Sequence, residues 1–142
     1  MNYPILAIAV LTLVAFVLHS TGGVWETLKI KPSRLRESKE TALADTEKND
    51  RIWTQSLCAF QMLGIDLLVM AGVLYALAAT DLILQKREVA LVCALIFLLW
   101  GFVWVVQMLF IKRSFKSLFT LPHWLIWFAC SAMVFYGSTQ FA

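Results

Sequence analysis

Residues 53–79 read WTQSLCAFQMLGIDLLVMAGVLYALAA. This stretch carries one charged residue, Asp66, close to its middle. A helix of about 20 apolar residues crosses the roughly 30 Å hydrocarbon core of a bilayer. The stretch therefore predicts a membrane-spanning helix that has a carboxyl group near its centre. Such a group costs about 2.5–3.5 kcal/mol on insertion scales, so Asp66 is expected to have a function.

Three further apolar stretches accompany this one and give four predicted spans. The others are expected at residues 4–25, 89–111 and 118–135, and a charged loop over residues 26–51 separates the first span from the second. Hydrophobic residues make up 61% of the chain and charged ones 15%, against about 45–50% and 25% in soluble domains. The sequence predicts a single all-α transmembrane domain over residues 1–142, an integral membrane four-helix bundle without a separate soluble catalytic domain.

Lysine and arginine are distributed unevenly between the two sides that four spans create. The 26–51 loop holds seven and the 112–117 connector three, whereas the 80–88 connector holds two. Because basic loops stay on the cytoplasmic side, the long loop is expected in the cytoplasm and both termini outside. The net charge of +3 then reflects topology, and nucleic acid is not expected as a partner. Within the long loop, Pro32-Ser33 predicts the start of a short surface helix, with a solvated loop as the alternative.

Polar side chains gather in the half of the predicted bundle nearer the cytoplasm. Asp66 is the deepest of them, and the others are Gln61, Gln107, His19 and His123. Together they predict a polar vestibule, open to the cytoplasm, in which Asp66 would bind and release protons as a proton-coupled transporter or proton conductance requires. The simpler alternative is a hydrogen bond from Asp66 to Thr12 or Gln107 that only holds the helices together.

Tryptophans on the third and fourth spans indicate a second candidate site. Trp100 and Trp104 share one face of the third span, and Trp127 lies on the fourth. Tryptophan normally concentrates at the membrane interfaces, so these positions suggest either a pocket for a flat ligand such as a quinone or a bulky packing seam. Haem b would need His19 and His123 to face each other at similar depth, and both lie toward the same side. No third ligand stands at metal-binding spacing, so no metal site is predicted.

The three cysteines are distributed among three different spans. Cys58, Cys93 and Cys130 lie in the second, third and fourth apolar stretches, and their spacing contains no CxxC pattern. We therefore expect all three to be small buried apolar residues of a helix bundle.

Three short motifs resemble those of a group of small bacterial four-span membrane proteins. They are L-H-S-T-G-G at residues 18–23, R-I-W at residues 51–53 and P-H-W at residues 122–124. The group carries a His-Ser-x-x-Gly-Glu pattern at the end of the first span and a Trp-His pair in the second. This chain has Val24 where the glutamate is expected and no histidine in its second span. The resemblance implies the four-span architecture and a bacterial inner membrane, and it implies no particular activity.

The functional hypotheses follow from three features of the sequence. The predicted spans contain few polar groups, no recognised set of catalytic residues is present, and the one long charged loop is suited to binding a partner. The leading hypothesis is a non-enzymatic accessory or assembly subunit of a membrane complex, in contact with membrane lipids and with other membrane subunits or further copies of itself. The first alternative is a proton-coupled transporter or proton conductance that uses Asp66. The second is a redox protein associated with quinone or haem.

Overall fold

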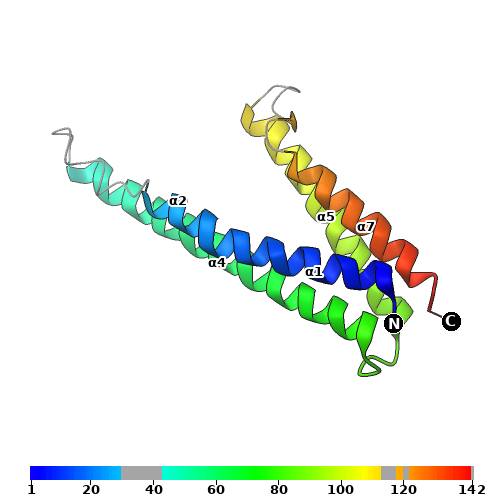
Figure 1. Ribbon diagram of the computed structural model, residues 1–142. Coiled ribbons are helices and arrows are strands. Elements are labelled where there is room, and N and C mark those ends of the chain that lie inside the picture. Colours follow the sequence, from blue (N-terminus) through cyan, green and yellow to red (C-terminus); the bar gives the residue numbers. More distant parts are fainter. Residues whose placement is uncertain (30–42, 113–117, 120–121, 142) are drawn as a thin grey trace. The chain divides into compact units, whose positions relative to one another are not determined.

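The computed structural model describes residues 1–29, 43–112, 118–119 and 122–141, and every regular element within them is helical (Figure 1). The elements are α1 (Tyr3–Leu18), the π-helix η1 (His19–Gly23), α2 (Val24–Lys29), α4 (Leu43–Ala79), α5 (Lys86–Lys112) and α7 (His123–Ser138). The first three follow one another without a break and form one long helix. The all-α prediction is thus confirmed for the described part, whereas the surface helix expected from Pro32 lies outside it.

Three of the helices are long and apolar enough to cross a membrane. They cover Tyr3–Lys29, Lys48–Ala79 and Lys86–Phe110. The chain therefore has the helices of a multi-pass membrane protein. The helix α7 has 16 residues and so measures about 24 Å, which is less than the usual thickness of the hydrocarbon core.

Two helices extend beyond the membrane spans predicted from the sequence. The first long helix continues through Lys29, past the predicted span limit at residue 25, and α4 begins at Leu43, ten residues before the predicted span limit at residue 53. An established helix gains one hydrogen bond for each residue that it adds, whether that residue is polar or apolar. Hydropathy predicts where a helix would leave the bilayer, which is a different position from where the helix ends.

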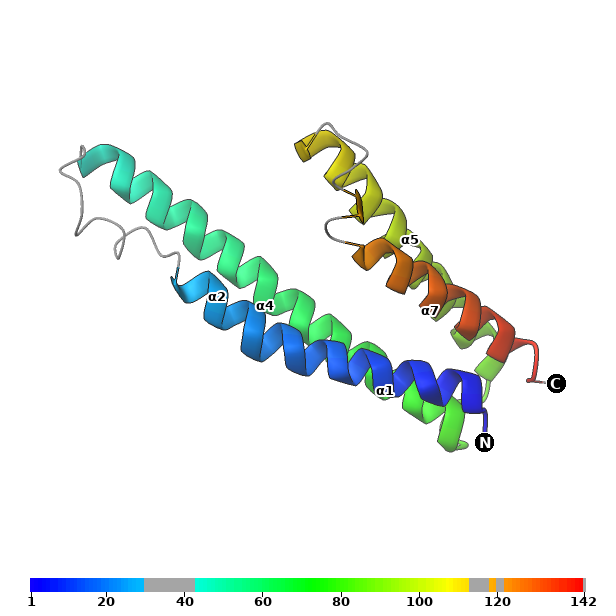
Figure 2. The same ribbon diagram turned by 45° about the horizontal axis from the view of Figure 1, so that its top comes forward.

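The described chain consists of two compact units. Unit 1 contains Met1–Val10 and Met70–Ala142, and unit 2 contains Leu11–Val69. The helices α1 and α4 each contribute residues to both units, and they run side by side within each unit (Figures 1 and 2). Each unit is therefore built around an α1–α4 pair, to which unit 1 adds α5 and α7.

Unit 1 has a tightly packed apolar core. Phe97, Leu74, Leu77, Ile5 and Val134 have no exposed surface, and they come from all four of its helices. The helices α5 and α7 lie side by side in both views and contact each other extensively (Figures 1 and 2). Small residues at the centre of the core allow this close approach of the helices, as is usual in membrane bundles; they are Ala9, Ala78, Ala90, Cys93, Ala94 and Cys130.

Asn2 connects the ends of three helices in unit 1 through hydrogen bonds. Its side-chain Nδ2 donates to the carbonyl oxygen of Gly137 at 2.7 Å, and its backbone N–H donates to the carbonyl oxygen of Ala78 at 3.0 Å. Its Oδ1 accepts from the backbone N–H of Ile5 at 3.2 Å, which is the N-cap arrangement at the start of α1. A Cβ atom on Gly137 would lie 2.5 Å from Cγ1 of Ile5, so only glycine allows this approach. We call these contacts the Asn2 clasp.

The connector between α4 and α5 has both charged and apolar side chains. Lys86 Nζ donates to Asp81 Oδ1 at 2.7 Å, and this hydrogen bond, together with the positive charge of Lys86, holds the pKa of Asp81 below its ordinary value. Leu82 and Leu84 are almost fully exposed in the same connector. Charges beside exposed leucines suit a turn that lies at the membrane surface.

Candidate functional site

His19 is held against α4 in unit 2 by a hydrogen bond and by ring stacking. Its Nε2 lies 2.8 Å from the carbonyl oxygen of Phe60, and the two rings stack with their centroids 3.6 Å apart. A carbonyl oxygen only accepts, so Nε2 carries the hydrogen of this bond. These contacts give His19 a partner on α4 within unit 2.

The backbone of the first long helix is irregular where it presents His19. Residues 19–23 form one π-helical turn, a feature that is frequent at functional sites. Two threonine hydroxyls bind carbonyl oxygens around this turn, Thr21 Oγ1 to Val17 at 2.7 Å and Thr27 Oγ1 to Gly23 at 2.8 Å. The turn is therefore stabilised by side chains as well as by its own backbone.

The close approach of His19 to α4 depends on Gly64. A Cβ atom at this position would lie 3.3 Å from Ser20 Oγ and 3.6 Å from His19 Cδ2. The first distance is tighter than an ordinary contact, so an added Cβ would displace Ser20 by a few tenths of an ångström and a larger side chain would displace it further. Gly64 thus sets the separation at which the His19–Phe60 hydrogen bond forms.

Substitution of Gly64 by valine is expected to separate the two helices and to break the His19–Phe60 hydrogen bond. Overpacking of this kind costs about 1–3 kcal/mol. The matched control is Gly72→Val on the same helix, because an added Cβ at Gly72 has no atom within 4 Å. Thermal unfolding in mild detergent measures the stability, and the ¹⁵N shifts of the imidazole report the bond. Equal stability of the two variants would contradict this role of Gly64.

Asp66 and Gln61 are both exposed on α4, on different sides of the helix. Five residues correspond to about 140° of rotation at 3.6 residues per turn. Asp66 forms no hydrogen bond or ion pair with another described residue, and His19 is bound at Phe60 instead. Unit 2 therefore does not gather these three predicted vestibule residues into one site.

The predicted site residues of unit 1 are mostly engaged in aromatic packing. Trp100 meets Trp127 edge to face at 5.3 Å, and Phe97 stacks on Trp127 at 6.0 Å. Trp104 lies against His123, with 4.8 Å between ring centroids, while Gln107 is exposed. These rings of α5 and α7 thus contact one another, as in a packing seam.

The residues proposed for haem ligation belong to different units. His19 lies in unit 2 and His123 in unit 1, and Nε2 of His19 is occupied by the Phe60 carbonyl oxygen. Within the part of the chain that the structure describes, no three His, Cys, Asp or Glu side chains come together as metal ligands. Cys93 and Cys130 are buried as predicted, but the prediction for Cys58 was wrong, because it lies on an exposed side of α4.

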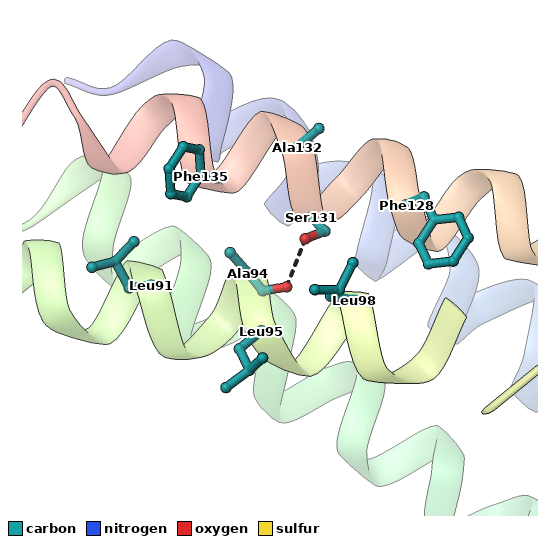
Figure 3. Close-up of a pocket in the computed structure, with 8 residues that line it drawn as sticks. All are labelled: Leu91, Ala94, Leu95, Leu98, Phe128, Ser131, Ala132 and Phe135. Atoms are coloured by element: carbon teal, nitrogen blue, oxygen red, sulfur yellow. Dashed lines mark hydrogen bonds between the residues drawn. The ribbon is translucent and has the colours of Figure 1, made fainter. Parts of the chain in front are cut away.

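An apolar groove between α5 and α7 was not predicted from the sequence (Figure 3). Its volume is about 460 Å³, and its lining consists of Leu91, Ala94, Leu95, Leu98, Phe128, Ser131, Ala132 and Phe135. The hydroxyl of Ser131 donates to the carbonyl oxygen of Ala94 at 2.8 Å, so its hydrogen is already used. The groove therefore suits hydrocarbon better than a polar ligand. In the sequence, the feature that could have indicated this groove is the set of small residues that face each other on the two helices.

One exposed face of α4 has the spacing of a helix-packing surface. Gln55, Ala59, Met62, Asp66 and Val69 follow one another at intervals of four and three residues, and all five are exposed. Met62 is 66% and Val69 59% exposed, and both lie on a helix long and apolar enough to cross a membrane. This spacing is the one at which two helices pack with side chains interlocked. We call these five residues the α4 seam.

Comparison with known proteins gives no relative for the chain. No family model matches it, and no curated protein or solved structure is similar to it. The resemblance to the bacterial four-span group stays a prediction.

Proposed function

We propose that the protein is a non-enzymatic accessory or assembly subunit of a membrane complex and that it binds another membrane-spanning helix through the α4 seam. The observation that carries this proposal is the exposed Asp66 on a helix long and apolar enough to span a bilayer. A carboxyl group that faces lipid is costly, and such groups normally face protein or water. A partner helix that offers Asp66 a hydrogen bond removes part of this cost.

The rest of the seam supports a helix as the partner. Ala59 is small enough to let a second backbone approach closely, as small residues do in membrane interfaces. Met62 and Val69 are of the size that fills the holes of a facing helix in coiled-coil packing. A small ligand would use a concave pocket, whereas the seam is a convex ridge along one helix.

We further infer four spans in a bacterial inner membrane, with α7 as the fourth and both termini outside. Ten of the twelve lysines and arginines then lie on the cytoplasmic side, in agreement with the positive-inside rule. A helix as short as α7 is accommodated by local thinning of the bilayer at a modest cost. The exposed leucines of the α4–α5 connector support an interfacial position at the outer surface.

Site-specific cross-linking in native membranes tests the partner. Met62→Cys, with Cys58 replaced by serine, is expected to form an adduct with a second membrane protein chain when treated with a thiol cross-linker. The matched control is Leu68→Cys, which is also exposed but lies about 160° around the helix from Asp66. The additional change Asp66→Leu is expected to lower the adduct yield about tenfold, because one interhelical hydrogen bond in a membrane contributes about 1–2 kcal/mol.

Three results of this experiment would contradict the proposal. The first is no adduct at Met62→Cys, and the second is equal adduct at both positions. The third is a cross-link from Met62→Cys to α5 or α7 of the same chain, since this would show that the chain covers its own seam.

A further inference from the structure

We propose that the helix that packs on the α4 seam is the α4 helix of a second copy of this chain, in a parallel two-fold dimer. This inference rests on the proposed function and names its partner. Two copies inserted with the same topology are related by a two-fold axis perpendicular to the membrane, and this axis makes equivalent helices parallel. In a parallel pair in register, each seam residue meets its own counterpart.

The polar residues of the seam are self-complementary in such a pair. The amide of Gln55 has both a donor and an acceptor, so two copies bind each other without a third group. A protonated carboxyl group has both a donor and an acceptor, so in such a pair the O–H of one Asp66 can donate to the carboxyl oxygen of the other. The seam contains no basic residue. A different partner would have to supply a donor at the depth of Asp66, whereas a second copy supplies it with its own carboxyl group.

The position of Asp66 within the seam also favours a pair of helices packed in one register. The spacing places Ala59 and Asp66 at the a positions of the heptad, and it places Gln55, Met62 and Val69 at the d positions. A single polar side chain at an a position specifies register and oligomeric state, because any shift leaves it opposite an apolar residue. The remaining a residue, Ala59, is small and allows the helices to approach. The seam thus has the pattern of a parallel helix pair.

Disulfide trapping of the full-length chain in liposomes tests the dimer. Cys58 is replaced by serine, and Cys93 and Cys130 are kept because both are buried. Met62→Cys is expected to give mostly disulfide-linked dimer under mild oxidation at high lipid dilution, and Leu68→Cys at least tenfold less. Asp66→Asn is expected to keep the dimer, because the amide is also self-complementary. Asp66→Leu is expected to weaken it about tenfold in a lipid-dilution series.

The outcomes separate this inference from the proposed function. If Met62→Cys reacts with a different protein in native membranes and the reconstituted chain stays monomeric, the dimer is overturned and the assembly role stands. If Met62→Cys reacts with no other chain in either setting, both fail. If Asp66→Asn disrupts the dimer as strongly as Asp66→Leu, self-complementary pairing at this position is overturned. Retained helicity by circular dichroism shows that each variant has folded.

Discussion

Replacement of Phe97 by alanine is expected to lower the free energy of unfolding of the chain by about 3 kcal/mol. Phe97 has no exposed surface and lies at the centre of the unit 1 core, with its ring against Trp100 at 5.6 Å and Trp127 at 6.0 Å. Truncation of a buried phenylalanine costs about 3–5 kcal/mol in soluble proteins. The lower end of this range applies here. Lipid is as apolar as the core, so the cost of the truncation comes mainly from the cavity and from the lost packing contacts.

A matched phenylalanine on the same helix provides the control for this prediction. Phe110 is 78% exposed, so Phe110→Ala is expected to change the free energy of unfolding by less than about 0.5 kcal/mol. Titration with a denaturing detergent, followed by far-ultraviolet circular dichroism, measures both variants. If Phe97→Ala is no less stable than Phe110→Ala, the helices of unit 1 are not held by this core.

Replacement of Asn2 by alanine is the second substitution with a large expected effect, about 2 kcal/mol of lost stability. The N-cap interaction with Ile5 contributes about 1 kcal/mol. The buried hydrogen bond to Gly137 contributes about another 1 kcal/mol, because its loss leaves a carbonyl oxygen without that donor. The same detergent titration measures the change. The neighbouring residue is 68% exposed, so Tyr3→Ala serves as the control, and an equal loss in both variants would exclude the Asn2 clasp as the cause.

The helices could be predicted from the sequence because hydropathy reports directly on what lipid tolerates. Membrane-length helices containing Asp66 and Trp100 lie where the apolar runs predicted them. The same signal does not give the start of α4, since it measures the membrane boundary and not the helix end. It also led to the wrong prediction that Cys58 is buried, because lipid-facing and protein-facing positions of a membrane helix are equally apolar.

The candidate sites were harder to predict because a linear sequence gives depth in the membrane but not direction around a helix. His19, Gln61 and Asp66 belong to the same half of the predicted bundle, and that common depth suggested a shared vestibule. The structure turns Gln61 and Asp66 to different sides of α4 and binds His19 to a backbone carbonyl group. The decisive residue for His19 is Gly64, which carries no chemical signal and acts only through the absence of a side chain.

The Asn2 clasp has a consequence for the order in which the protein is made. Its bond to Gly137 joins positions 135 residues apart, so it closes only after Gly137 has been translated. Unit 2 is a continuous segment, Leu11–Val69, and its helices meet while the remainder is still being translated. Ribosomes add roughly 5–20 residues per second, so the two events are separated by several seconds. During that interval the side chain of Asn2 lacks its acceptor on α7.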